Sequence, residues 1–146
     1  MTPSIRRRTF TAGALALAAA PGGAGAQGQQ RSARIAFLDV VDDEDHFQVF
    51  AQAIASLGWV QGRNLTIERR NLSGLFTVVE RDRIADELVR QSLDLIFCLG
   101  TGAVDPILRK TRTLPVVFAQ VADPVASGFA ASLARPGGNA TGTSTL

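Results

Sequence analysis

Residues 94–124 constrain the fold of this chain more than any other stretch, because two apolar runs there are joined by a short polar and helical segment. The runs, residues 94–99 and 115–119, are almost continuously apolar, which is typical of strands in a parallel sheet covered on both faces. Segments that contain polar residues follow each run, at 100–102 and 120–123. Ligands bind at the carboxyl ends of the strands in open α/β sheets, so this stretch predicts a small-molecule site.

The rest of the chain continues the alternation of strands and helices. Helices are expected after each of the first three strands and, in a shorter form, at residues 125–134. The strands are expected at residues 34–39, 64–69, 94–99, 114–119 and 141–146. This order predicts an α/β fold, a doubly wound, Rossmann-like parallel sheet with right-handed crossovers. The last strand has no helix after it, so we expect the domain to be incomplete.

The first two helices carry start signals. Residues 42–45 are acidic, which suits a helix amino terminus because carboxylates cap its free N–H groups. Thr77 and Glu80 have the spacing of a capping box. Behind the acidic residues, apolar side chains recur at helical spacing, and these predict the buried face of the first helix: Phe47, Phe50, Ala51, Ile54 and Leu57.

The start of the third helix is ambiguous. A start at Thr101 places Pro106 inside the helix, where a proline costs a backbone hydrogen bond. A cap at Asp105 places Pro106 at the favoured first position instead. The second version is sterically easier, and it makes residues 101–104 a loop.

Residues 1–26 indicate a secretory signal peptide. Three arginines at 6–8 precede the apolar run 11–20, and the small residues 24–26 predict cleavage after Ala26. Arg7 and its neighbours resemble a twin-arginine export signal, so either that route or the general secretory route is open. The apolar run is too short to span a membrane, which takes roughly 20 residues. We therefore expect a periplasmic protein with a polar leader at residues 27–33.

Charge and composition exclude several classes of function. Removing the three arginines of the signal leaves 12 of the 15 basic residues against 13 acidic ones. No clustered basic face remains, so we expect no nucleic-acid partner. Cys98 lies inside an apolar strand and is expected to be a core residue. His46 is the only histidine and no G-x-S-x-G occurs, so we expect no catalysis, metal or cofactor.

A dinucleotide fingerprint is the closest rival motif. It would need G-x-G-x-x-G after the first strand, whereas Gly100 and Gly102 follow the third strand. Asp105 stands where the third glycine belongs. The match is therefore weak.

A specific family resemblance appears in the last part of the chain. Residues 114–142, LPVVFAQVADPVASGFAASLARPGGNATG, resemble the central signature of exported ABC transporter substrate-binding proteins of the TrpX-like type. The motifs at residues 57–59, 62–64 and 100–101 also match the layout of that family. The resemblance implies two α/β domains of the type I periplasmic-binding kind that close on a ligand. Residues 34–146 would form the first domain, and the second would be missing.

The resemblance also implies a function and a set of contacts. Such a receptor binds a small polar solute, possibly an amino acid, and delivers it to an ABC permease in the inner membrane. An exported α/β enzyme, or an orphan ligand-binding module unrelated to transport, is the alternative. The cleft face of the first domain is formed by the loops after the first, third and fourth strands, which gives these ligand-binding candidates: Val41, Asp42, Thr101, Gly102, Ala103 and Asp123.

Each candidate has a chemical role to offer. The Thr101 hydroxyl and the N–H groups of Gly102 and Ala103 suit an anionic group such as a carboxylate. Asp123 suits an ammonium or amide group, or else it is only a turn carboxylate before Pro124.

Overall fold

The computed structural model describes residues 31–145. The predicted signal peptide, its cleavage after Ala26 and most of the leader lie outside the described residues. Residues 31–145 contain five strands and three helices: β1 (Ala33–Asp39), α1 (Glu44–Ser56), β2 (Leu65–Asn71), α2 (Val78–Val89), β3 (Leu95–Leu99), α3 (Thr101–Lys110), β4 (Val116–Val121) and β5 (Ala140–Ser144).

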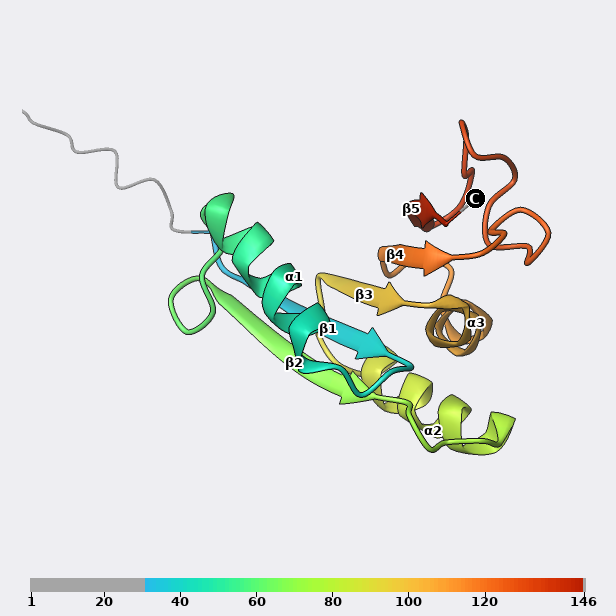
Figure 1. The fold of residues 1–146 in the computed structure, drawn as a ribbon, viewed down its shortest axis with the longest axis horizontal. Coiled ribbons are helices and arrows are strands. Elements are labelled where there is room, and N and C mark those ends of the chain that lie inside the picture. Colours follow the sequence, from blue (N-terminus) through green and yellow to red (C-terminus); the bar gives the residue numbers. More distant parts are fainter. Residues whose placement is uncertain (1–30, 146) are drawn as a thin grey trace, which may run out of the picture.

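The five strands form one parallel sheet in the order β2-β1-β3-β4-β5. Figure 1 shows the arrows of β1, β3 and β4 pointing to the same side of the molecule. β2 lies at one edge, next to β1, and the chain then crosses to the other side of β1 to form β3. The predicted doubly wound α/β fold is therefore confirmed.

The helices divide unequally between the two faces of the sheet. α2 and α3 pack on one face, where they bury side chains such as Leu88 and Ile107 against Leu38 and Cys98. α1 packs on the opposite face, where Phe37 lies in contact with rings from the helix and from β3. Successive strand residues alternate between these faces, as pleated strands require.

The start signals of α1 and α2 act as predicted. Asp43 caps α1 by accepting a hydrogen bond from the backbone N–H of Asp45. Thr77 and Glu80 form the predicted capping box at the start of α2. Leu57 departs from prediction: α1 ends at Ser56, and Leu57 is 78% exposed rather than part of the buried face.

The favoured start of the third helix was wrong. α3 begins at Thr101 and not at Asp105, so Pro106 lies inside it. Gly100, at φ 88, turns the chain directly from β3 into the helix. Proline removes one backbone hydrogen bond. Because α3 buries five of its ten residues, Pro106 among them, packing against the sheet offsets that loss.

The predicted short helix at residues 125–134 is also wrong. A single turn follows Pro124, whose carbonyl accepts a hydrogen bond from the N–H of Phe129 at 2.8 Å. Gly128, at φ 73, ends this turn before a helix can propagate. Irregular chain then leads to β5. Among residues 31–145, none of the helices is long and apolar enough to cross a membrane.

Candidate ligand-binding site

The candidate site is the edge of the sheet at which all five parallel strands end. The strand order reverses at β1, because β2 lies on one side of it and β3 on the other. Ligands of doubly wound sheets bind at such a switch point, outside the carboxyl ends of the strands. The two loops that flank it here follow β1 and β3, and both carry predicted site residues.

The structure brings these two loops into contact through Val40. A Cβ atom added at Gly100 would lie 2.8 Å from Val40 Cγ2, and one added at Gly102 would lie 3.3 Å from Val40 Cγ1. Glycine is therefore needed at position 100, for the close approach and for its positive φ, whereas a side chain at position 102 would only be tight against Val40. Val41 and Asp42, which follow Val40, are exposed at this edge.

The start of α3 presents fewer donors than the sequence predicts. Ala103 is wholly buried, and its N–H donates to the carbonyl of Gly100 at 3.1 Å. Thr101 and Gly102 are half-buried at the helix amino terminus, where N–H groups and the helix dipole favour an anion. The Thr101 hydroxyl oxygen also accepts a 3.5 Å hydrogen bond from the N–H of Ala122, which ties α3 to the end of β4.

Asp123 is exposed and takes part in the turn after β4. Its Oδ1 accepts hydrogen bonds from the N–H groups of Val125 at 3.1 Å and Ala126 at 2.8 Å. Three residues earlier, Gln120 has a backbone φ of 56, a left-handed conformation that is unusual for a residue other than glycine. The pairing of β4 with β5 shifts register between Phe118 and Val121. The end of β4 is therefore irregular, and such backbone strain concentrates at functional sites.

Asp39, the last residue of β1, was not among the predicted site residues. Its side chain is fully buried, and its Oδ1 accepts a hydrogen bond from Asn71 Nδ2 at 2.5 Å. Its Oδ2 has no hydrogen-bond partner among the described residues, although Arg69 Nη2 lies 3.7 Å away. Burial raises the pKa of Asp39 above its ordinary value, and the charge of Arg69 opposes that rise without cancelling it.

Asn71, at the end of β2, holds the loop after β1 in place. Its Nδ2 donates to the carbonyl of Val41 at 3.0 Å as well as to Asp39, and its Oδ1 accepts from the N–H of Ser73. One signal was available in the sequence, because Asp39 and Asn71 are polar residues placed directly at the ends of strands. Their hydrogen bonds hold the loop after β1, which carries the predicted site residues Val41 and Asp42.

Arg69 of β2 contacts the first turn of α1. Its guanidinium forms an ion pair with Glu44, and it lies 4.9 Å from the centre of the Phe47 ring. Hydrogen bonding to Glu44 raises the pKa of Arg69. Both contacts fix the first turn of α1 beside the end of β2, and so they set one border of the edge.

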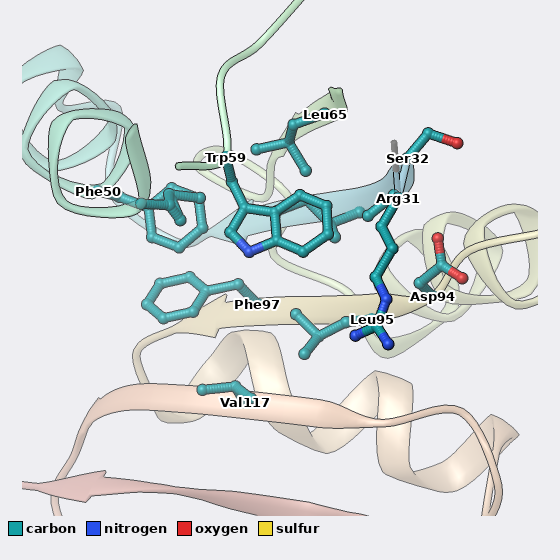
Figure 2. Close-up of a pocket in the computed structure, with 12 residues that line it drawn as sticks. Arg31, Ser32, Phe50, Trp59, Leu65, Asp94, Leu95, Phe97 and Val117 are labelled. Atoms are coloured by element: carbon teal, nitrogen blue, oxygen red, sulfur yellow. The ribbon is translucent and has the colours of Figure 1, made fainter. Parts of the chain in front are cut away.

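Two hollows adjoin α1. The first, of about 300 Å³, lies at the carboxyl ends of the strands, with Asp43 and His46 of the α1 start, Phe97 of β3 and Gln120 among its lining residues. The second, of about 690 Å³, is mainly apolar, and Figure 2 shows Trp59 beside Phe50 with Phe97 and Val117 below. It extends towards the opposite, amino ends of the strands, away from the predicted contacts.

The described residues include no cluster of three or more His, Cys, Asp or Glu side chains able to hold a metal ion. Burial raises the pKa of the Cys98 thiol far above its ordinary value, so no reactive thiolate is available there. The edge can present backbone N–H groups, a hydroxyl and a carboxylate, which are groups that bind a solute.

Comparison with known proteins gives this edge a context. Residues 42–146 match the model of the family described as ABC transporter substrate binding protein. Among curated proteins, the chain is 32% identical over 95 residues to the tyrosine-binding protein of Clostridioides difficile strain R20291. The match covers 65% of this chain and 27% of that protein.

Solved structures also align with this chain. A conserved domain protein from Vibrio cholerae aligns with a TM-score of 0.72 and 26% identity, over 80% of this chain and 40% of that one. A ligand-free, open substrate-binding protein with adhesive properties from Clostridium difficile aligns with a TM-score of 0.70 and 28% identity. An ABC domain in complex with L-Trp from Streptococcus pneumoniae aligns with a TM-score of 0.68 and 26% identity. The last two matches each cover 77% of this chain and 38% of the other, so this chain spans 40% or less of these relatives.

Proposed function

The chain belongs to the family of ABC transporter substrate-binding proteins, and from this premise we propose that its carboxyl strand edge forms one wall of a cleft that binds an amino acid. The wall is built from the loop after β1, the start of α3 and the turn after β4. The activity is binding and release of the solute.

The contact of Val40 with Gly100 and Gly102 supports this proposal most directly. It places the loop after β1 and the amino terminus of α3 side by side at the switch point of the sheet. A solute carboxylate bound there would receive hydrogen bonds from Thr101 and Gly102. The helix dipole would add a favourable interaction.

Asp123 and the relatives narrow the class of solute. The Asp123 carboxylate, exposed after β4, suits the ammonium group of the same amino acid. The relatives favour an aromatic side chain, since one is named for tyrosine and another was solved with L-Trp. The solute of this protein is thus proposed to be an aromatic amino acid.

Delivery of the solute completes the proposed role. An exported protein of this family would work in the periplasm and pass its solute to an ABC permease in the inner membrane. Closure of two domains around the solute would present the loaded form to that permease. The chain carries one of the two walls in this scheme.

Amide chemical-shift mapping of the 146-residue chain tests the binding role. Because one wall makes only part of the contacts, we expect weak binding of L-tyrosine and L-tryptophan, with Kd of about 1 mM or higher. The shifts should concentrate at Thr101, Gly102 and the turn after Asp123. Thr101→Val and Asp123→Asn should each weaken binding severalfold.

Thr66→Val is the matched control for Thr101→Val, because Thr66 is an exposed residue of β2 that lies away from the carboxyl ends of the strands. It should leave binding unchanged. The absence of shifts at saturating amino acid, or shifts confined to residues far from this edge, would contradict the proposal.

A further inference from the structure

Arg81, the fourth residue of α2, is a partly buried cation without an anionic partner in the described part of the chain. Its Nε donates a hydrogen bond to the carbonyl of Leu75 at 2.8 Å, and its guanidinium forms no ion pair within residues 31–145. The other described lysines and arginines that are partly buried all pair with carboxylates, and they are Arg69, Arg70 and Lys110. Charges that are withdrawn from water are normally paired, so Arg81 marks a place for an anion.

The guanidinium of Arg81 lies against the start of α3. A Cβ atom added at Gly102, the second residue of α3, would lie 3.0 Å from Arg81 Nη1. The absence of a side chain at position 102 thus leaves space for the guanidinium. Arg81 therefore stands at the carboxyl edge of the sheet, beside one of the two residues proposed to bind the solute carboxylate.

This position is electrostatically unfavourable for a cation. Arg81 belongs to the first turn of α2 and also lies beside the first turn of α3, so it is close to two helix amino termini. A helix amino terminus carries a partial positive charge, which repels a cation and attracts an anion. An anion bound here would interact favourably with both helices and with Arg81.

The carboxylates near Arg81 already have other partners. Arg81 lines a hollow of about 80 Å³ together with Asp105 and Arg109. Asp105 accepts a hydrogen bond from Arg109, which also donates to Asp82 at 2.6 Å, and Glu80 completes the capping box of α2. A water molecule occupies about 30 Å³ in the liquid, so the hollow has room for a carboxylate group but not for a whole amino acid.

We infer that Arg81 binds the carboxylate of the solute and makes that group a requirement for binding. The inference rests on the proposed function. Because Leu75 holds Nε, the two Nη groups remain to donate parallel hydrogen bonds to one carboxylate, and the N–H of Gly102 adds a third donor. An amide has an NH₂ group in place of the second oxygen, and that group cannot accept. The guanidinium thus discriminates against a solute whose carboxylate is replaced by an amide.

L-tryptophan and L-tryptophanamide test the inference, because they share the ring and the ammonium group and differ at the carboxylate. Their binding to the 146-residue chain is followed by the amide chemical shifts of Thr101 and Gly102. The unaltered chain should bind L-tryptophan about tenfold more tightly, as one charge-assisted hydrogen bond provides. In Arg81→Gln this preference should fall to about twofold. Arg81→Lys keeps the charge but loses the paired donors, and it should give an intermediate preference.

Arg112→Gln is the matched control. Arg112 is exposed, forms no ion pair within the described residues and precedes β4, at the amino ends of the strands. Its replacement should leave both affinities unchanged. Thermal unfolding separates binding from a structural role. Because the charge of Arg81 opposes two helix dipoles, Arg81→Gln should have a Tm equal to or higher than that of the unaltered chain.

Two results would overturn the inference and leave the proposed function standing. One is an unchanged preference for L-tryptophan over its amide in Arg81→Gln. The other is a lower Tm of Arg81→Gln with equal weakening of both ligands, which would make Arg81 a structural residue. If L-tryptophan shifts no residue of the edge in the unaltered chain, the proposed function fails and the inference fails with it.

Discussion

Asp39 shows how the end of one strand can hold a charge that the fold does not fully compensate. The side chain is fully buried, and Oδ2 lacks a hydrogen bond among the described residues. Desolvation raises its pKa, so the folded state favours the protonated carboxyl. A group with a raised pKa contributes its stability below the unfolded value, about 3.9, and loses it as the pH rises through the folded value.

Replacement of Asp39 by Asn should therefore stabilise the protein at neutral pH. The amide imitates the neutral carboxyl, and its oxygen can still accept the hydrogen bond from Asn71. Thermal unfolding followed by circular dichroism should give Asp39→Asn the higher Tm at pH 7, with the difference closing below a pH of about 3.9. Asp42→Asn, an exposed change whose charge contributes less than burial to the raised pKa of Asp39, should raise the Tm less. A lower Tm for Asp39→Asn at pH 7 would show that Arg69 compensates the charge after all.

At the scale of elements, the turn after β4 depends on how closely β5 approaches. A Cβ atom added at Gly142 would lie 2.0 Å from the carbonyl oxygen of Phe118 and 2.5 Å from its ring. Glycine in a strand often marks such a close backbone approach. The irregular pairing follows at once, so this close contact lies directly before Gln120 and the turn to Asp123.

Gly142→Ala should force β4 and β5 apart. We expect a loss of about 1–3 kcal/mol in the free energy of unfolding, as for other overpacking substitutions, measured by urea denaturation. Gly138→Ala is the control, since a Cβ atom there meets nothing within 4 Å. It should change stability by no more than about 0.5 kcal/mol. Equal effects of the two substitutions would mean that the strands separate without cost.

Elements with strong local signals could be predicted from the sequence. The capping box at Thr77 and the apolar runs of β3 and β4 were placed correctly because their causes are local. The start of α3 was not, because burial of Pro106 against the sheet outweighs its lost hydrogen bond and no local pattern reports that burial. The prediction of a helix at residues 125–134 failed for a different reason, because the positive φ of Gly128 ends the first turn.

At the scale of the whole molecule, the edge could be foreseen but its internal support could not. The order of strands and helices places the loops after β1, β3 and β4 at one edge. The position of Thr101 and Asp123 at that edge therefore follows from the topology. The contact of Asn71 with Asp39 and Val41 joins residues about 30 positions apart. A sequence alone does not reveal such pairs. The uneven covering of the two faces is likewise visible only once α2 and α3 are seen on one face.

This imbalance between the faces predicts unequal local stability. None of the residues of α1 is fully buried, whereas α3 buries five. Segments with few buried apolar contacts open with lower free energy, so α1 should exchange its amide hydrogens faster than α3. In native-state hydrogen exchange we expect at least tenfold lower protection for the middle of α1, equivalent to about 1.4 kcal/mol. Equal protection of α1 and α3 would contradict this prediction, because it would mean that the uneven covering of the two faces does not weaken α1.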